Sequence, residues 1–334
     1  MPEQSRESLD AASIAAGLRD PREHIRLARL AELVRSSKSD PSMFDALAAC
    51  LNDTNPSARQ LAALALGAMG APAATYLVEA LDERQPVSIR ITAASGLSRA
   101  GANATPAIEP LAKCLDSSDE LLRWHAAFAL SKIGSAALPL LITKLASTDP
   151  AVQCAAVNAL GWIGNGAGTA IEAIKRLSSS TSITLRFAAC SALIRISGDS
   201  SAGLPAMLTA LDDRDESVRF AAVQRIGEVG HLTQSSAPRI LQSLSDSSPS
   251  VRAAAALTLA RIDAKGPEVV QALARLLRDP DAEVQAAAGI AISDLGKDAE
   301  SALPQLRSMQ NASDARVVAI GKAAGERISQ AANK

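Results

Sequence analysis

The chain has 334 residues, of which 48% are hydrophobic, 21% are charged and only 2% are aromatic, and its formal net charge is −1. So few aromatic residues disfavour β-sandwiches and β-barrels, whose strands depend on β-branched and aromatic side chains. The high apolar content excludes a disordered chain, and the balanced charge argues against a strongly electropositive nucleic-acid or membrane binder. We therefore expect an all-α protein with a core built mainly from Ala and Leu, which are strong helix formers.

The N-terminal part of the chain gives no sign of secretion. Residues 1–10 are polar and acidic, without the apolar segment of a signal peptide. The uncharged stretch 61–78 is long enough to span a membrane, but Gly70 and Pro72 interrupt it, so we expect two separate helices there. The sequence accordingly favours a cytoplasmic protein with no membrane partner.

A repeat of about 33 residues runs through nearly the whole sequence. Its most constant feature is an Arg that follows an apolar residue, Val in some repeats, here called the anchor, and successive anchors lie 30 to 33 residues apart. The anchor is Gln in two repeats. The anchors are Arg26, Arg59, Arg90, Arg123, Gln153, Arg186, Arg219, Arg252, Gln285 and Arg316.

Each repeat is predicted to form two helices. The first helix, such as 137–145, often carries a Pro fourteen residues before the anchor, a position suited to a first helical turn. A polar turn such as 147–150 or 212–215 follows, and its Asp or Ser can cap the second helix. The second helix ends at a Gly that can adopt the backbone conformation needed to stop it. These glycines are Gly70, Gly101, Gly134, Gly164, Gly230 and Gly296.

The repeat resembles the HEAT-repeat family, in the short bacterial form also called PBS-lyase HEAT-like repeats. The resemblance rests on the pattern Asp-x-x-Val-Arg-x-x-Ala-Ala-x-x-Leu-Gly-x-Ile-Gly, which is nearly intact at 215–230 and recognisable at 149–164. It implies a right-handed α-solenoid of about ten stacked helical hairpins. The expected organisation is a single array over 1–334, with an N-terminal capping unit at 8–38, regular repeats at 39–298, a C-terminal capping unit at 299–330 and a tail at 331–334.

The repeated arginines invite two interpretations, an anion-binding row or a structural ladder. In HEAT repeats the corresponding Arg pairs with Asp residues of the turns, and Asp residues stand shortly before many anchors here. We therefore expect a structural ladder. Its members are Arg59, Arg90, Arg123, Arg186, Arg219 and Arg252.

Five of the seven aromatic residues occupy the first, fifth or ninth position after an anchor, in four consecutive repeats. At 100° per residue these positions lie away from the face that packs on the first helix. The resemblance implies that this side lines a concave groove, where aromatic residues and Arg or Lys are typical interface anchors. The candidate partner-binding residues are Trp124, Phe128, Lys132, Trp162, Phe187, Arg195, Phe220 and Arg261. The alternative is that these rings pack between adjacent repeats.

No pattern of catalytic or metal-binding residues is present. His24, His125 and His231 lie in different repeats without metal-ligand spacing, and the sequence has no Walker, GxSxG or GxGxxG motif. The four cysteines are far apart and lie in apolar stretches, where Cys is usually structural. We expect no enzymatic activity, no metal and no cofactor.

The predicted function is a non-catalytic scaffold or adaptor that binds another protein or peptide in its groove, and we expect a monomer. One alternative, drawn from the resemblance, is an accessory role like that of the bilin lyases that share the repeat. A second alternative is nucleic-acid binding like that of HEAT-like DNA glycosylases. The balanced charge argues against this second alternative, because such a groove needs to be basic.

Overall fold

The computed structural model describes residues 11–36, 40–312 and 314–332. Within these ranges all regular secondary structure is helical, with no strand. Parts of the predicted capping unit at 8–38 and of the tail at 331–334 lie outside the described residues. The chain divides into two compact units, unit 1 over residues 1–173 and unit 2 over residues 174–334.

Unit 1 consists of five pairs of helices. They are α1 (Ala11–Leu18) and α2 (Glu23–Ser36), α3 (Phe44–Cys50) and α4 (Pro56–Ala68), α5 (Ala71–Glu79) and α6 (Val87–Ala100), α7 (Ile108–Cys114) and α8 (Glu120–Ile133), and α9 (Leu138–Lys144) and α10 (Pro150–Ile163). Short 3₁₀ helices connect several of them, at η1 (Pro41–Met43), η2 (Gly101–Ala107), η3 (Gly134–Ala137) and η4 (Gly164–Ala170).

Helix α11 (Ile171–Leu177) contains the boundary between the units, and unit 2 continues the same pattern. Its helices are α12 (Ile183–Ser197), α13 (Leu204–Ala210), α14 (Glu216–Val229), α15 (Ala237–Ser243), α16 (Pro249–Arg261), α17 (Pro267–Leu276), α18 (Ala282–Asp294), α19 (Leu303–Ser308) and α20 (Ala315–Ala332). The 3₁₀ helices are η5 (Ser200–Ala202), η6 (Gly230–Ser236), η7 (Gly296–Ala302) and η8 (Met309–Asn311).

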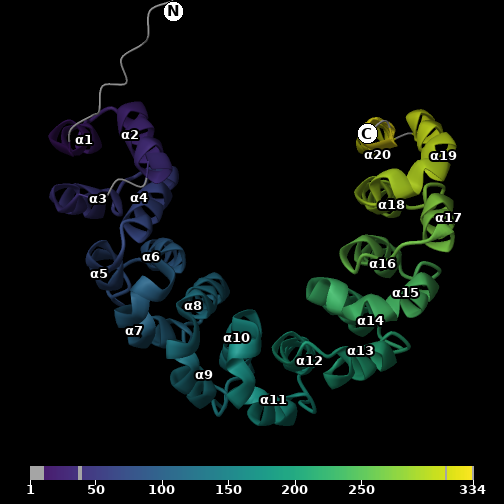
Figure 1. Cartoon of the computed structure of the whole chain (residues 1–334), viewed down its shortest axis with the longest axis horizontal. Coiled ribbons are helices and arrows are strands. Elements are labelled where there is room, and N and C mark those ends of the chain that lie inside the picture. The colour runs from purple at the N-terminus through teal and green to yellow at the C-terminus, as the bar shows by residue number, and fades with distance from the viewer. Residues whose placement is uncertain (1–10, 37–39, 313, 333–334) are drawn as a thin grey trace, which may run out of the picture. The chain divides into compact units, whose positions relative to one another are not determined.

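Two rows of helices run side by side in each unit (Figure 1). In unit 1 the even-numbered helices α2 to α10 pack on one another in sequence, and each also packs on the odd-numbered helix before it. In unit 2 the row α12, α14, α16, α18 and α20 is likewise continuous, with α13, α15, α17 and α19 beside it. The predicted fold class, an all-α solenoid of about ten stacked hairpins, is confirmed.

The helix boundaries lie where the sequence predicts them. Pro139 is in the first turn of α9, and the Asp149 carboxylate caps α10 by accepting a 2.8 Å hydrogen bond from the Ala151 amide. Gly134 and Gly164 end α8 and α10 with φ of 84° and 72°, values that a residue with a Cβ rarely adopts. The polar turn and the glycine therefore fix where each second helix begins and ends.

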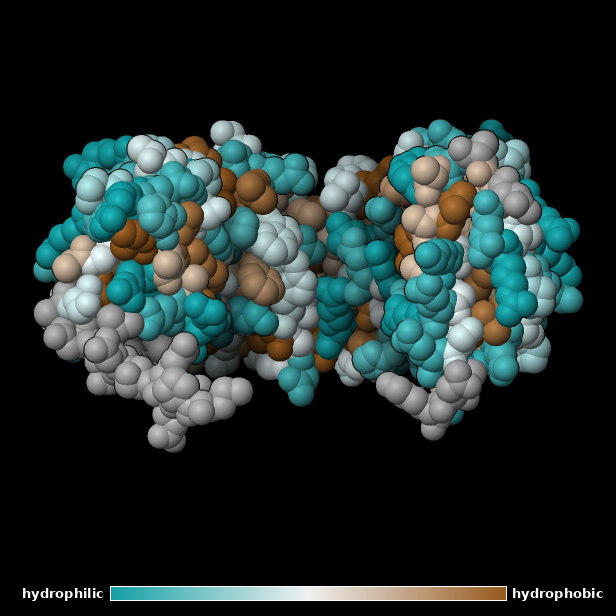
Figure 2. All heavy atoms as spheres, turned by 90° about the horizontal axis from the view of Figure 1, so that it is seen from above, coloured by the Kyte–Doolittle hydropathy of each residue, from teal (hydrophilic) through white to brown (hydrophobic). Residues whose placement is uncertain are grey.

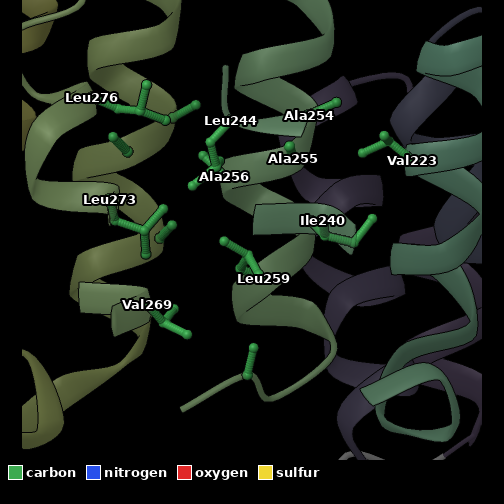
Figure 3. Close-up of a cluster of buried hydrophobic side chains, with 14 of the residues drawn as sticks. Val223, Ile240, Leu244, Ala254, Ala255, Ala256, Leu259, Val269, Leu273 and Leu276 are labelled. Carbon is green, nitrogen blue, oxygen red and sulfur yellow. The ribbon is translucent and has the colours of Figure 1, made fainter. Parts of the chain in front are cut away.

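Small residues allow very close contact between second helices. A Cβ built on Gly96 of α6 would lie 2.5 Å from the main-chain oxygen of Ala63 in α4, and one on Gly67 would lie 2.1 Å from the oxygen of Gly96. These two helices therefore meet backbone to backbone. In unit 2 it is small Ala residues that occupy the core. Ala254, Ala255 and Ala256 of α16 lie among Leu and Val side chains of neighbouring helices (Figure 3).

One continuous helical stretch among the described residues, 120–144, is apolar and long enough to cross a membrane by length and composition. It comprises α8, η3 and α9, and the chain changes direction between the two α-helices at Gly134. Both α-helices pack on neighbouring repeats, α8 on α6, α7 and α10, and α9 on α7 and α10. The stretch 61–78 is divided in the same way between α4 and α5, as predicted.

Candidate functional site

The periodicity of α8 places a row of large side chains on one side of this helix. Leu121, Trp124 and Phe128 follow one another at intervals of three and four residues, which align on one helical face. Leu121 is 55% exposed and Trp124 is 44% exposed. Large apolar side chains with such exposure are few among the described residues, and two of them are neighbours here.

Trp162 of α10 joins this row to form a cluster of three rings. The rings of Trp124 and Phe128 are stacked, with centroids 5.3 Å apart and an interplanar angle of 12°. Trp162 meets both edge-on, at 5.9 Å from Trp124 and 5.7 Å from Phe128. Such stacked and edge-to-face pairs add roughly 0.5–1.5 kcal/mol each to the burial they provide. The cluster is therefore held rigidly by two packed helices while the Trp124 ring stays open to solvent.

Two further groups border the rings. Lys132, one turn beyond Phe128, is exposed and places its Nζ 4.9 Å from the centroid of the Phe128 ring. His125 lies edge-on to Trp124 at 4.9 Å, and partial burial lowers the pKa of its imidazole below the ordinary value. We refer to Leu121, Trp124, Phe128, Lys132 and Trp162 as the aromatic surface.

Phe187 and Phe220 do not belong to an exposed surface. Phe187 is 1% exposed and lies in the hydrophobic core of unit 2 with Met207 and Val223, and the partly buried ring of Phe220 packs against that core. These two residues therefore fit the alternative interpretation given in the sequence analysis, in which the rings pack inside the protein rather than line a groove. The reason is that α12 is enclosed on all sides, since every residue from 187 to 194 is buried.

The remaining candidate residues, Arg195 and Arg261, differ in their environment. Arg195 donates a hydrogen bond to the main-chain oxygen of Glu228 at the end of α14, and burial lowers the pKa of its guanidinium. It is therefore engaged in helix packing. Arg261, at the end of α16, is exposed to solvent.

Two of the predicted ladder residues, Arg219 and Arg252, pair with an Asp in the next repeat, and so does the anchor Arg26, which was not among the predicted ladder residues. Arg26, Arg219 and Arg252 each bind a carboxylate 27 residues further on, at Asp53, Asp246 and Asp279, through paired Nε and Nη2 hydrogen bonds of 2.6 to 3.0 Å. All six side chains are at most 16% exposed. Paired hydrogen bonds between guanidinium and carboxylate are strong and directional. These pairs therefore connect consecutive hairpins.

A second contact, which the sequence analysis missed, is more regular. Arg59, Arg123, Arg186, Arg219 and Arg252 each donate to the main-chain oxygen six residues earlier, in the turn before their own helix. Gln285 makes the same contact to Asp279, and Gln153 reaches Leu145. The signal in the sequence was that every anchor is Arg or Gln, both of which are long side chains that can donate a hydrogen bond.

The other predicted ladder residues lack the acidic partner. Within the described ranges no carboxylate lies within ion-pair distance of Arg59, Arg90, Arg123 or Arg186. Arg90 instead donates to the Sγ of Cys114 at 3.5 Å. The paired Asp stands six residues before the next anchor, and this position holds Arg84, Ser117 and Ser147 in the repeats that follow Arg59, Arg90 and Arg123. Asp213 stands there in the repeat after Arg186, and nothing in the structure explains why the two do not pair.

The structure shows no arrangement suited to metal chemistry in the part of the chain that it describes, because no three His, Cys, Asp or Glu side chains come together. Cys50, Cys114 and Cys190 are buried, and burial raises the pKa of their thiols. Clefts of about 830 Å³ in unit 2 and about 470 Å³ in unit 1 are lined by residues outside the aromatic surface.

On the face of the molecule seen in Figure 2, hydrophobic residues are divided into small groups. Figure 2 shows them as separate brown areas among hydrophilic residues, on the face that the view presents. Exposed single apolar side chains are normal in folded proteins, so a small group of aromatic rings is more informative than its area suggests. The aromatic surface is thus the most specific candidate site in unit 1.

Comparisons with known proteins agree with the repeat. The family model for HEAT repeats matches residues 11–98, 108–193 and 237–324. No curated protein matches the chain. Among solved structures, the chain is similar to Kap121p, with 15% identity and a TM-score of 0.54. It is also similar to the D353K/E396K/D438K mutant of Kap121p, with 15% identity and a TM-score of 0.53. Both alignments cover 96% of this chain and 42% of the other chain. The chain thus spans less than half the length of Kap121p.

A further match is the complex of CpcE and CpcF of phycocyanin lyase from Nostoc sp. PCC7120. It has 20% identity and a TM-score of 0.41, and the alignment covers 82% of this chain and 96% of that chain.

Proposed function

This chain belongs to the HEAT-repeat family, and we propose that it is a non-catalytic scaffold that binds a partner protein or peptide through the aromatic surface of unit 1. The observation that carries the proposal is the exposed, rigidly held Trp124 ring, stacked on Phe128 and bordered by Trp162. In a protein with 2% aromatic residues, three such rings on two adjacent helices are a marked concentration.

The energetics of protein interfaces support this assignment. A few residues carry most of the binding free energy, and Trp and Arg are enriched among them. The three rings are already ordered by contact with one another, so binding costs little side-chain entropy. The exposed Leu121 extends the apolar area, and Lys132 provides a polar border.

The proposal includes a cytoplasmic, monomeric protein without enzymatic activity of its own. His24, His125 and His231 belong to three different elements, α2, α8 and η6, so they offer no common catalytic centre. The neighbouring rings give His125 a packing role.

A capture experiment tests the proposal. The purified protein and a Leu121→Ser/Trp124→Ser variant are used as bait in native lysate, after circular dichroism has shown equal helicity. An Ile290→Ser variant is the matched control, because Ile290 is also an exposed apolar residue on a second helix and is 42% exposed. We expect a prey that is captured by the native protein and the control and lost with the double variant. A prey retained equally by all three baits would place binding elsewhere on the protein.

A further inference from the structure

The second helices around the aromatic surface carry charges almost entirely of one sign. Helices α4, α6, α8 and α10 contain a single acidic residue, Glu120, in the first turn of α8. The connections that follow α6, α8 and α10, at 101–107, 134–137 and 164–170, contain no acidic residue. The region beside the C-terminal ends of these helices therefore lacks carboxylates of its own.

Two exposed cations stand in this region. Arg99 and Lys132 occupy the same repeat position, nine residues after the anchor, on the adjacent helices α6 and α8. Within the described ranges neither has an ion-pair partner, and the Lys132 Nζ lies over the face of the Phe128 ring. At the next such position stands Trp162. The order along the helix row is thus cation, cation, indole.

Unit 2 provides the contrast within the same fold. At the same repeat position it has Arg195, Glu228, Arg261 and Asp294, and all of these side chains except the exposed Arg261 are engaged within the unit. Arg195 bonds to α14, Glu228 accepts from Arg225 at 2.9 Å, and Asp294 accepts from Arg327 at 2.9 Å. Unit 2 thus has an exposed cation at this position on one helix, α16, whereas unit 1 has them on the adjacent helices α6 and α8 beside the aromatic surface.

We propose that the occupant of the aromatic surface is an acidic peptide segment that presents an aromatic or aliphatic side chain between carboxylates. This inference rests on the proposed function and specifies the partner's chemistry. The apolar side chain contacts Leu121, Trp124 and Trp162, while the carboxylates face Lys132 and Arg99. Complementary charge at the border of an interface accelerates association and discriminates against basic partners.

A polypeptide fits these features better than a nucleic acid does. A single strand carries one phosphate per nucleotide, and proteins that bind strands line the path with several cations as well as aromatic rings. Here two exposed cations accompany the rings, and the whole chain has a net charge of −1. Two cations match the few carboxylates of a short peptide segment.

The protein's own tryptophans make the test direct, because Trp124 and Trp162 are its only two and both lie in the aromatic surface. The probe is a short Trp-free peptide of Glu, Leu and Phe. It is compared with the same peptide carrying Lys in place of Glu, with one carrying Ser in place of Leu and Phe, and with oligo-dT. Tryptophan emission and the anisotropy of labelled ligands measure the binding. We expect only the Glu, Leu and Phe peptide to shift the emission.

The variant Arg99→Glu/Lys132→Glu separates charge from apolar contact. We expect it to weaken binding of the acidic peptide about tenfold and to strengthen binding of the Lys peptide. Arg261→Glu is the matched control, because Arg261 is an exposed Arg at the same repeat position in unit 2, and it should leave the affinity unchanged within about twofold.

The outcomes distinguish this inference from the proposed function. If the Lys peptide binds the native protein as tightly as the acidic one, and Trp124→Ser removes both, the surface binds peptides without preference for acid, and only the inference is overturned. Stronger binding of oligo-dT than of any peptide would overturn both. If no peptide changes the emission at millimolar concentration, the inference is wrong, and the capture experiment then decides the proposed function separately.

Discussion

The guanidinium of Arg219 binds the carboxylate of Asp246, 27 residues further along the chain, through two hydrogen bonds of 2.7 and 2.8 Å. The main-chain oxygen of the same Asp accepts a 2.9 Å hydrogen bond from Arg252, and its carboxylate also accepts the amide of Ser248. One aspartate thus bonds to the repeat before it, to its own turn and to the helix that follows. The connection between consecutive hairpins is concentrated at such turns.

Replacing Arg219 by Gln should reduce the free energy of unfolding by about 1–3 kcal/mol. Gln keeps a donor for the turn carbonyl, as Gln285 does, but leaves the largely buried Asp246 carboxylate without its partner. Urea unfolding measures the change. Arg316→Gln is the control, because Arg316 is 68% exposed, its partners Glu283 and Asp314 are 68% and 27% exposed, and pairs of exposed side chains contribute little. Equal effects of the two substitutions would contradict this account.

The same aspartates predict acid sensitivity. The Arg219 hydrogen bond holds the pKa of Asp246 below its ordinary value of 3.8. Burial raises the pKa of Asp279, but the hydrogen bonds from Arg252 and the Asp281 amide outweigh it, and the net shift is downward. Because both folded-state pKa values are depressed, the stabilisation is complete above pH about 4 and is lost as the pH falls below it. Urea unfolding at a series of pH values should show this decline.

The acid sensitivity should be smaller without these carboxylates. An Asp246→Asn/Asp279→Asn variant is expected to be less stable than the native protein at neutral pH and to depend less on pH between 2 and 4 than the native protein does. An unchanged slope in this variant would assign the acid sensitivity to other groups.

Gly96→Ala should destabilise unit 1 by about 1–3 kcal/mol, because the added methyl would lie 2.5 Å from the main-chain oxygen of Ala63 and force α4 and α6 apart. Gly168→Ala is the matched control, since nothing lies within 4 Å of its added Cβ. The control should be neutral or stabilising by about 0.4–1 kcal/mol through the unfolded state. Thermal or urea unfolding compares the two variants. Equal losses of stability would falsify the close backbone contact between α4 and α6.

Phe187 and Trp124 occupy the same repeat position and should respond in opposite ways. Phe187→Ala opens a cavity in the core of unit 2 and is expected to cost about 3–5 kcal/mol. Trp124→Ala removes a half-exposed ring with one stacked and two edge contacts, and about 1 kcal/mol is expected. Urea unfolding measures both, and losses of similar size would mean that Trp124 is a core residue.

The repeat could be predicted from sequence because its signals are local. Pro139 and Gly134 each satisfy a backbone requirement of their own turn or helix end, and this requirement is independent of neighbouring repeats. The row of second helices followed from the spacing of the anchors. Family resemblance then supplied the stacking of the hairpins.

The exposure of individual positions was harder to predict, because it depends on what packs on either side. Phe187 was predicted on the partner face and is buried, and Leu121 was overlooked and is 55% exposed. A signal existed for Phe187, since Arg186 and Arg195 are the only charged residues of α12 and apolar residues occur all around its axis, as is typical of enclosed helices. For Leu121 the signal was its spacing of three residues from Trp124.

The restriction of both tryptophans to unit 1 also makes the protein a reporter of its own unfolding. Trp124 and Trp162 will register the loss of structure around α8 and α10, whereas unit 2 has no indole and unfolds without a tryptophan signal. Circular dichroism follows the helices of both units. In a repeat array whose stability is spread over neighbour contacts, the two transitions coincide only when the whole array unfolds cooperatively. The difference between the two midpoints is therefore a direct measure of the cooperativity between the halves.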